Sequence, residues 1–93
     1  GMDIRKVFGH NMRRVRLAAG LSQEAAAEII GVGRAHAGSM ERGQQNVTIL
    51  ILWQVAQAFG CRAADLLDEA AARAFAASLT TTKAPRKRRR VAR

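Results

Sequence analysis

Residues 34–42 combine polar and small side chains at a spacing that could place chemistry on one face of a helix. Arg34, Ala35, Gly38 and Ser39 recur at helical intervals, which brings them together if this segment is helical. A guanidinium can donate two hydrogen bonds to guanine, a hydroxyl can bond a base edge, and a small apolar side chain can contact the methyl group of thymine. If the segment enters DNA, as the resemblance given below implies, Arg34 is the strongest candidate for reading a base, with Ala35, Gly38 and Ser39 beside it. The alternative role of Arg34 is a contact with phosphate.

Other polar residues around this segment suit the binding of phosphate oxygens. Gln23 follows Ser22, which is a typical helix N-cap, so its amide and the helix N-terminus could hold an anion together. Polar side chains after residue 43 could grip phosphate from the other side, with the capping of a turn as the alternative role of Asn46. The predicted phosphate contacts from this reasoning are Gln23, Gln44, Asn46 and Thr48.

Catalytic and metal-binding chemistry find no support in the sequence. Cys61 is the one cysteine, and its distance along the chain from His10 and His36 does not suit a set of zinc ligands. The acidic residues at 65–69 cluster without a paired base or nucleophile. We therefore predict that the protein is not an enzyme and binds no metal or cofactor.

Helices must position these side chains. Apolar residues recur with helical periodicity, glycines separate the periodic segments, and the sequence lacks the alternating patterns of strands. The second and third periodic segments are joined by a tight turn at Gly31, and Ala27 is small enough to let two helices cross closely, which is typical of a helix-turn-helix. We predict a compact all-α domain of five helices, over about residues 3–19, 23–30, 34–42, 49–59 and 63–79.

Charge and composition limit the class of protein further. The net charge is +9, but residues 80–93 hold seven lysines and arginines and no acid, so the rest of the chain is only mildly basic. We predict one domain over residues 3–79 and a disordered basic tail over residues 80–93, which binds phosphates without sequence preference or, alternatively, only aids solubility. No apolar segment is long enough to span a membrane and no signal peptide is visible, so we expect a cytoplasmic, nucleoid-associated protein without a membrane partner.

Six short motifs, in this order, make the sequence resemble the Cro/phage-repressor family, which is also called the xenobiotic-response-element type. The resemblance covers about residues 7–67 and rests on RRVR at 13–16, GLSQ at 20–23, GV at 31–32, MERG at 40–43, NVT at 46–48 and VAQAFG at 55–60. The family usually has larger residues where Ala26 and Ala37 stand, and proline where Val47 stands. We expect larger neighbours to fill the space that the two alanines leave, and the candidates are Phe8, Ile29 and Trp53.

The resemblance implies a lambda-repressor-like DNA-binding domain in which residues 34–42 enter the major groove. It also implies an internal ion pair between Arg16 and Glu41 that fixes the angle of this helix. Cys61 is implied to be buried. His36 is implied either to contact a phosphate or to pack beside the backbone. The implied function is a transcriptional regulator, and specifically a repressor that binds a palindromic operator in double-stranded DNA as a homodimer, without a small-molecule effector. Two alternatives are an antitoxin-type module that neutralises a toxin enzyme and autoregulates its operon, and a restriction-modification controller.

A homodimer needs apolar surface beyond that which the core uses. The predicted helix at residues 63–79 carries such a stripe, and its small alanines would let two copies approach closely with Phe75 as the anchor. The predicted dimer contacts are Leu67, Ala71, Ala74 and Phe75. The alternative is that this helix folds back and buries the stripe within its own subunit.

Overall fold

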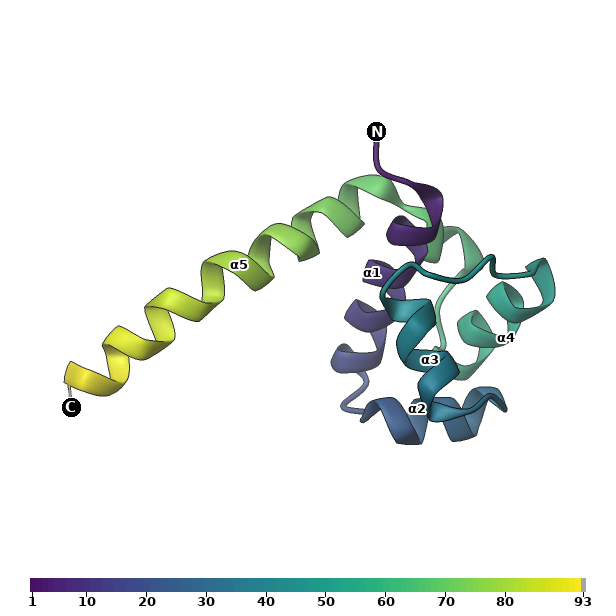
Figure 1. Cartoon of the computed structure of the whole chain (residues 1–93), viewed down its shortest axis with the longest axis horizontal. Coiled ribbons are helices and arrows are strands. Elements are labelled where there is room, and N and C mark those ends of the chain that lie inside the picture. Colours follow the sequence, from purple (N-terminus) through teal and green to yellow (C-terminus); the bar gives the residue numbers. More distant parts are fainter. Residues whose placement is uncertain (93) are drawn as a thin grey trace.

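The computed structural model describes the backbone of residues 1–92 and the side chains of residues 1–80. That part of the chain contains helices and no strands, which confirms the predicted all-α fold (Figure 1). The prediction of a disordered tail over residues 80–93 falls almost wholly outside the described side chains and stays a prediction. The α-helices are α1 (Ile4–Ala18), α2 (Gln23–Ile30), α3 (Arg34–Glu41), α4 (Ile49–Phe59) and α5 (Glu69–Ala92), and a short 3₁₀ helix, η1 (Ala63–Leu67), lies between α4 and α5.

Local hydrogen bonds set the ends of the central helices close to where the sequence predicts them. The hydroxyl of Ser22 accepts a hydrogen bond from the backbone N–H of Ala25 at 3.0 Å and so caps α2. Thr48 caps α4 in the same way, by accepting from Ile51 at 3.1 Å. Gly31 ends α2 with a φ of 91°, a left-handed conformation that glycine adopts without a steric penalty.

The structure divides the last predicted helix, over residues 63–79, into two elements, so the prediction of one continuous helix is wrong. η1 ends at Leu67, and Asp68 has an extended backbone conformation before α5 begins. Asn11 accounts for the break: its fully buried carboxamide Nδ2 donates to the carbonyl oxygens of Leu66, at 3.1 Å, and of Asp68, at 3.0 Å. The bond from Asn11 gives the carbonyl oxygen of Leu66 a partner, whereas that of Asp68 also accepts from the backbone N–H of Ala72 at 3.1 Å, in the first turn of α5.

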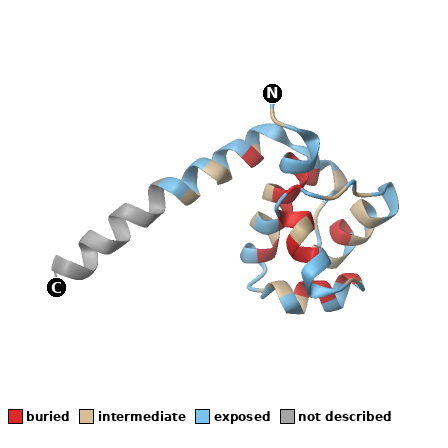
Figure 2. Cartoon of the chain, viewed as in Figure 1, coloured by how far each residue is buried: buried red, intermediate tan, exposed pale blue. Residues whose placement is uncertain are grey.

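The hydrophobic core lies where α1, α2, α3, α4 and η1 meet, and the buried residues in Figure 2 gather there. Ala26 and Ala37 are fully buried, and Phe8 lies in the core as expected, with 3% of its surface exposed. Ile29 and Trp53, by contrast, are 54% and 56% exposed, so the prediction that they fill the core is wrong. The largest fully buried side chains are those of Met12, Met40, Leu66, Val7, Val55 and Asn11.

The backbones of α1 and α3 approach each other at Gly9. A Cβ atom at this position would lie 2.5 Å from the carbonyl oxygen of Glu41 and 2.8 Å from that of Met40. Because these neighbours are backbone atoms at the end of α3, they cannot move aside as a flexible side chain could. Gly9 therefore permits the close contact that positions α3 on the rest of the domain.

Candidate nucleic-acid interface

α2 and α3 form a helix-turn-helix whose turn comprises residues 31–33. Ala27 is 2% exposed, and the close packing of the two helices depends on this small residue. On α3, Ala37 and Met40 are buried in the core, whereas Arg34 is exposed. α3 thus has one face toward the interior and the opposite face free to enter a groove of DNA.

A buried network of polar side chains holds the C-terminal end of α3. Arg16 of α1 donates from Nε to Oε2 of Glu41 at 2.7 Å and from Nη2 to Oε1 at 3.1 Å. Its remaining nitrogen, Nη1, donates to the carbonyl oxygen of Leu21 at 2.9 Å. Gln23 adds a third bond to the carboxylate, from Nε2 to Oε1 at 3.1 Å. The pair that the resemblance implies is therefore present, and it connects α1, α2 and α3.

The outer face of α3 contains a shallow hollow of about 370 Å³. Its floor consists of the small residues Ala35 and Gly38, and two guanidinium groups, those of Arg34 and Arg42, line it. Gln23 lines it from α2, and because its Nε2 is bonded to Glu41, the carboxamide oxygen is the atom left to face the hollow. A Cβ atom on Gly38 would lie 3.2 Å from that oxygen. Two guanidinium groups, which donate hydrogen bonds, and one carboxamide oxygen, which accepts them, therefore surround a surface formed by alanine and glycine.

Arg42 is a candidate residue that the sequence analysis missed. It lies one helical turn beyond Gly38 and two turns beyond Arg34, so the spacing that groups the other residues also includes Arg42. The predicted helix over residues 34–42 already included Arg42, and the structure places it just after the last residue of α3. Its Nε donates to the side-chain oxygen of Gln44 at 3.2 Å, which leaves its Nη groups at the hollow.

The predicted base contact of Ser39 competes with bonds inside the protein. Its hydroxyl donates to the carbonyl oxygen of His36 at 2.7 Å and accepts from Nε2 of Gln45 at 3.0 Å. His36 is exposed, but it lies on the side of α3 away from the hollow residues, two positions before Gly38. The structure thus groups Arg34, Ala35 and Gly38 with Arg42, and places Ser39 and His36 at the margin.

The residues predicted to grip phosphate beyond α3 are exposed and carry hydrogen bonds to neighbours. Gln44 accepts from Arg42, and the side-chain oxygen of Asn46 accepts from Nη1 of Arg5 at 3.4 Å. The Asn46 bond is long, and it uses only the side-chain oxygen. Within the described part of the chain, the amide nitrogen of Asn46 has no recorded hydrogen bond and can donate to a phosphate. Thr48 uses its oxygen as an acceptor in the α4 cap, so its hydroxyl proton can still be donated to a phosphate.

The charges at the start of α1 are largely paired with each other. Arg5 forms a salt bridge with Asp3 at 2.8 Å, and its side-chain hydrogen bonds lower the pKa of the Asp3 carboxyl to about 2. Glu69, at the start of α5, has a pKa below its usual value because it accepts from the backbone N–H of Met2 and from Arg73. Both carboxylates are exposed and remain ionised at neutral pH, so they offset part of the positive charge of the domain.

The four residues predicted to form a dimer contact do not share one free face. Leu67 belongs to η1 and Ala74 is exposed on α5, but Ala71 and Phe75 are half-buried. The first turns of α5 pack against α1, where Ala72 is fully buried. Ala71 and Phe75 are therefore partly covered within the subunit, although α5 extends from the globule rather than folding back over it (Figure 1), and the dimer contact on this helix stays a prediction.

Comparison with known proteins agrees with this architecture and extends it. A helix-turn-helix family model, HTH_3, matches residues 12–66. The chain is 38% identical over 66 residues to the uncharacterized HTH-type transcriptional regulator y4dJ of Sinorhizobium fredii, covering 71% of this chain and 86% of that protein. It is 41% identical over 66 residues to the control protein C.SmaI of Serratia marcescens, covering 71% and 79%. Among solved structures, the restriction-modification controller protein C.AhdI of Aeromonas hydrophila superimposes with a TM-score of 0.64 at 37% identity, covering 67% and 94%.

The fold and these relatives together define a DNA-binding transcriptional regulator of the helix-turn-helix class. The chain belongs to the helix-turn-helix family HTH_3, which is the Cro/phage-repressor type that its motifs resemble. Its relatives are transcription regulators and control proteins rather than enzymes. Among the residues that the structure describes, no helix has the length and apolar character to cross a membrane.

Proposed function

We propose that this regulator is a repressor that binds a palindromic operator as a homodimer. The observation that carries the proposal is the hollow on α3, where Arg34 and Arg42 flank a floor of Ala35 and Gly38. Such a surface can admit the edge of a base pair while guanidinium groups bond to guanine on either side. The buried bonds of Glu41 to α1 and α2 support a fixed orientation for this surface before DNA is bound.

The phosphate contacts in this proposal come from the N-termini of α2 and α4. α2 precedes α3 in the chain and α4 follows it. The first backbone N–H groups of each helix favour a nearby anion. Gln23 and Thr48 stand at these two ends, and the exposed Gln44, Asn46 and His36 could add contacts between them. These groups would position the domain on the duplex, and the α3 residues would provide the sequence preference.

The homodimer follows from the small size of the reading surface. One short helix contacts only a few base pairs, which is too few to select a site within a genome. Two helices related by two-fold symmetry, about 34–36 Å apart on successive major grooves, read a palindrome instead. In this proposal the protein acts in the cytoplasm on double-stranded DNA, has no catalytic activity and needs no small-molecule effector.

The second candidate function is control of a restriction-modification system. It is favoured by the similarity to C.AhdI, which is named a restriction-modification controller protein, and to C.SmaI, which is named a control protein. The physical chemistry of DNA binding would be the same, and only the genes next to the operator would differ. The operator sequence, mapped to the genome, separates the two functions, because a controller binds beside restriction and methyltransferase genes.

The test is selection of bound sites from random duplex DNA, followed by sequencing. The proposal predicts an enriched inverted repeat whose half-sites are centred about one helical turn apart. A variant with both Arg34→Ala and Arg42→Ala is the control, because it should keep the helical spectrum of the wild type and enrich no motif. Enrichment of the same motif by this variant, or no motif for the wild type, would contradict the proposal.

A further inference from the structure

The carboxamide of Gln23 is held in one orientation by its neighbours. Its Nε2 donates to Oε1 of Glu41 at 3.1 Å, and both oxygens of that carboxylate also accept from Arg16. An ionised carboxylate can only accept hydrogen bonds, so turning the amide over would set two oxygens against each other. Glu41 cannot turn away to relieve this contact, because only 3% of its side chain is exposed and Arg16 holds it. Oε1 of Gln23 is therefore directed toward the hollow on α3.

Hydrogen-bond donors lie beside this oxygen. Nη1 of Arg42 and Oε1 of Gln23 both lie 3.2 Å from the point where a Cβ atom on Gly38 would stand. The two atoms therefore flank the same part of the floor of the hollow, and glycine leaves that part empty. Nε of Arg42 is bonded to Gln44, and within the described part of the chain no recorded hydrogen bond uses its two Nη groups. Arg42 thus offers a fork of two donors next to one acceptor.

Two donors beside one acceptor match the edge of one base pair in the major groove. Guanine presents two acceptors there, N7 and O6, and the paired cytosine presents its N4 amino group as a donor. A guanidinium can bond to both guanine atoms, and a carboxamide oxygen next to it can accept from the cytosine. Adenine would bring an amino group to the place of O6, against the second donor of the fork. The arrangement therefore favours a G·C pair over an A·T pair.

A phosphate group does not suit the oxygen of Gln23. Phosphate oxygens are negatively charged acceptors, so they repel a carboxamide oxygen that is prevented from turning. The predicted phosphate contact of the Gln23 side chain therefore conflicts with its bond to Glu41. The backbone N–H groups at the start of α2 can still hold a phosphate, because that interaction does not use the side chain.

We propose that Gln23 and Arg42 together read a G·C base pair. Oε1 of Gln23 accepts from the N4 amino group of cytosine, while the two Nη groups of Arg42 donate to guanine. The inference rests on the proposed function for sequence-specific DNA binding, and it deepens that function by naming a base pair and the residues that select it. The phosphate contact at this end of α2 then belongs to the backbone. Glu41 is a positioning residue, since its charge decides which end of the amide meets DNA.

The experiment measures binding to the selected operator when one cytosine is replaced by N4-methylcytosine. This base still pairs with guanine, but a methyl group takes the place of the amino hydrogen in the major groove. The position to modify is the G·C pair whose preference is lost when site selection is repeated with Gln23→Ala. Wild type is expected to bind the modified operator about 10-fold more weakly, because the fixed oxygen is left without a donor. Gln23→Ala should bind both operators equally, since it lacks that oxygen.

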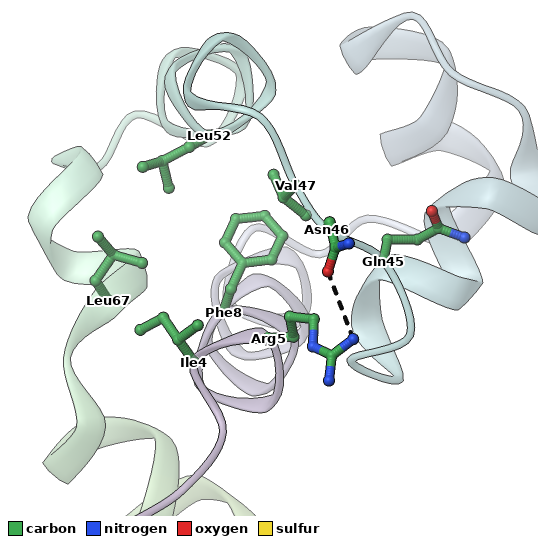
Figure 3. A pocket seen from close by; sticks show the side chains of 8 residues that line it. All are labelled: Ile4, Arg5, Phe8, Gln45, Asn46, Val47, Leu52 and Leu67. Carbon is green, nitrogen blue, oxygen red and sulfur yellow. Dashed lines mark hydrogen bonds between the residues drawn. The ribbon is translucent and has the colours of Figure 1, made fainter.

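Asn46→Ala is the matched control. Figure 3 shows its carboxamide oxygen facing Arg5, at a pocket that shares no residue with the hollow on α3. This variant should bind both operators more weakly by the same factor, and the difference between them should remain. A variant of Gln23 that only disturbed the fold would behave in the same way, so the ratio of the two affinities separates base reading from a structural role.

Three results would overturn the inference. They are equal binding of the two operators by wild type, a difference that persists in Gln23→Ala, and an unchanged selected motif for Gln23→Ala. In each of these cases an enriched inverted repeat for the wild type would still support the proposed function. Absence of any enriched motif for the wild type would overturn both the proposed function and the inference that rests on it.

Discussion

Replacing Glu41 by Gln removes the negative charge that Arg16 faces in the interior of the domain. Only 10% of the Arg16 side chain and 3% of the Glu41 side chain are exposed, so water cannot take the place of the lost partner. The change keeps the size of the side chain, but it sets an amide NH₂ group against a guanidinium that needs acceptors. Arg16 retains its bond to the carbonyl oxygen of Leu21, which offsets part of the loss.

The expected cost follows from this geometry. Removing one partner of a buried ion pair typically costs about 3–5 kcal/mol, because the other charge is left without compensation. Since the Leu21 bond and one amide oxygen remain, we expect a value near the lower end, about 3 kcal/mol. This is a large share of the roughly 5–15 kcal/mol by which a small domain is stable. The lost free energy should appear as a lower midpoint of unfolding rather than as a changed slope.

Urea unfolding followed by circular dichroism measures this free energy. The double variant Arg16→Met with Glu41→Met is the control, because it removes both charges and should be less destabilised than Glu41→Gln. The reasoning would be refuted if Glu41→Gln cost less than about 1 kcal/mol, or if the double variant were the less stable of the two.

Three further predictions concern single side chains. Arg34→Ala should weaken binding to the selected operator by about 1–3 kcal/mol and relax one base position, as measured by titration of operator and unrelated duplexes; an equal loss on all sequences would assign Arg34 to phosphate. Gly9→Ala should lower stability by about 1–3 kcal/mol in urea unfolding, because the new Cβ meets backbone atoms of α3, whereas the new Cβ in Gly33→Ala meets nothing within 4 Å, so this control should lose only the preference for glycine over alanine at the N-cap of α3. Burial raises the pKa of the Cys61 thiol, so alkylation at pH 8 should be slower in the folded protein than in urea, and equal rates would contradict this.

Much of the helical framework could be predicted from the sequence, because its signals are local. Ser22 and Thr48 cap the helices that they precede, and Gly31 ends α2, each through bonds to residues only a few positions away. The helix-turn-helix motif depends on the same local signals and on the order of short motifs. Arg34 and Ala35 could be predicted at the interface for this reason, since helical spacing alone places them on one face.

Tertiary structure decided the features that depend on residues far apart in the chain. Asn11 interrupts the last predicted helix through bonds to carbonyl groups more than 50 positions away. Gly9 is required by the backbone of α3, which helical periodicity cannot reveal. Trp53 has a large apolar side chain of the kind that often lies in a core, yet the neighbouring helices leave it exposed. Burial depends on how the elements pack, whereas periodicity shows only which residues share a face.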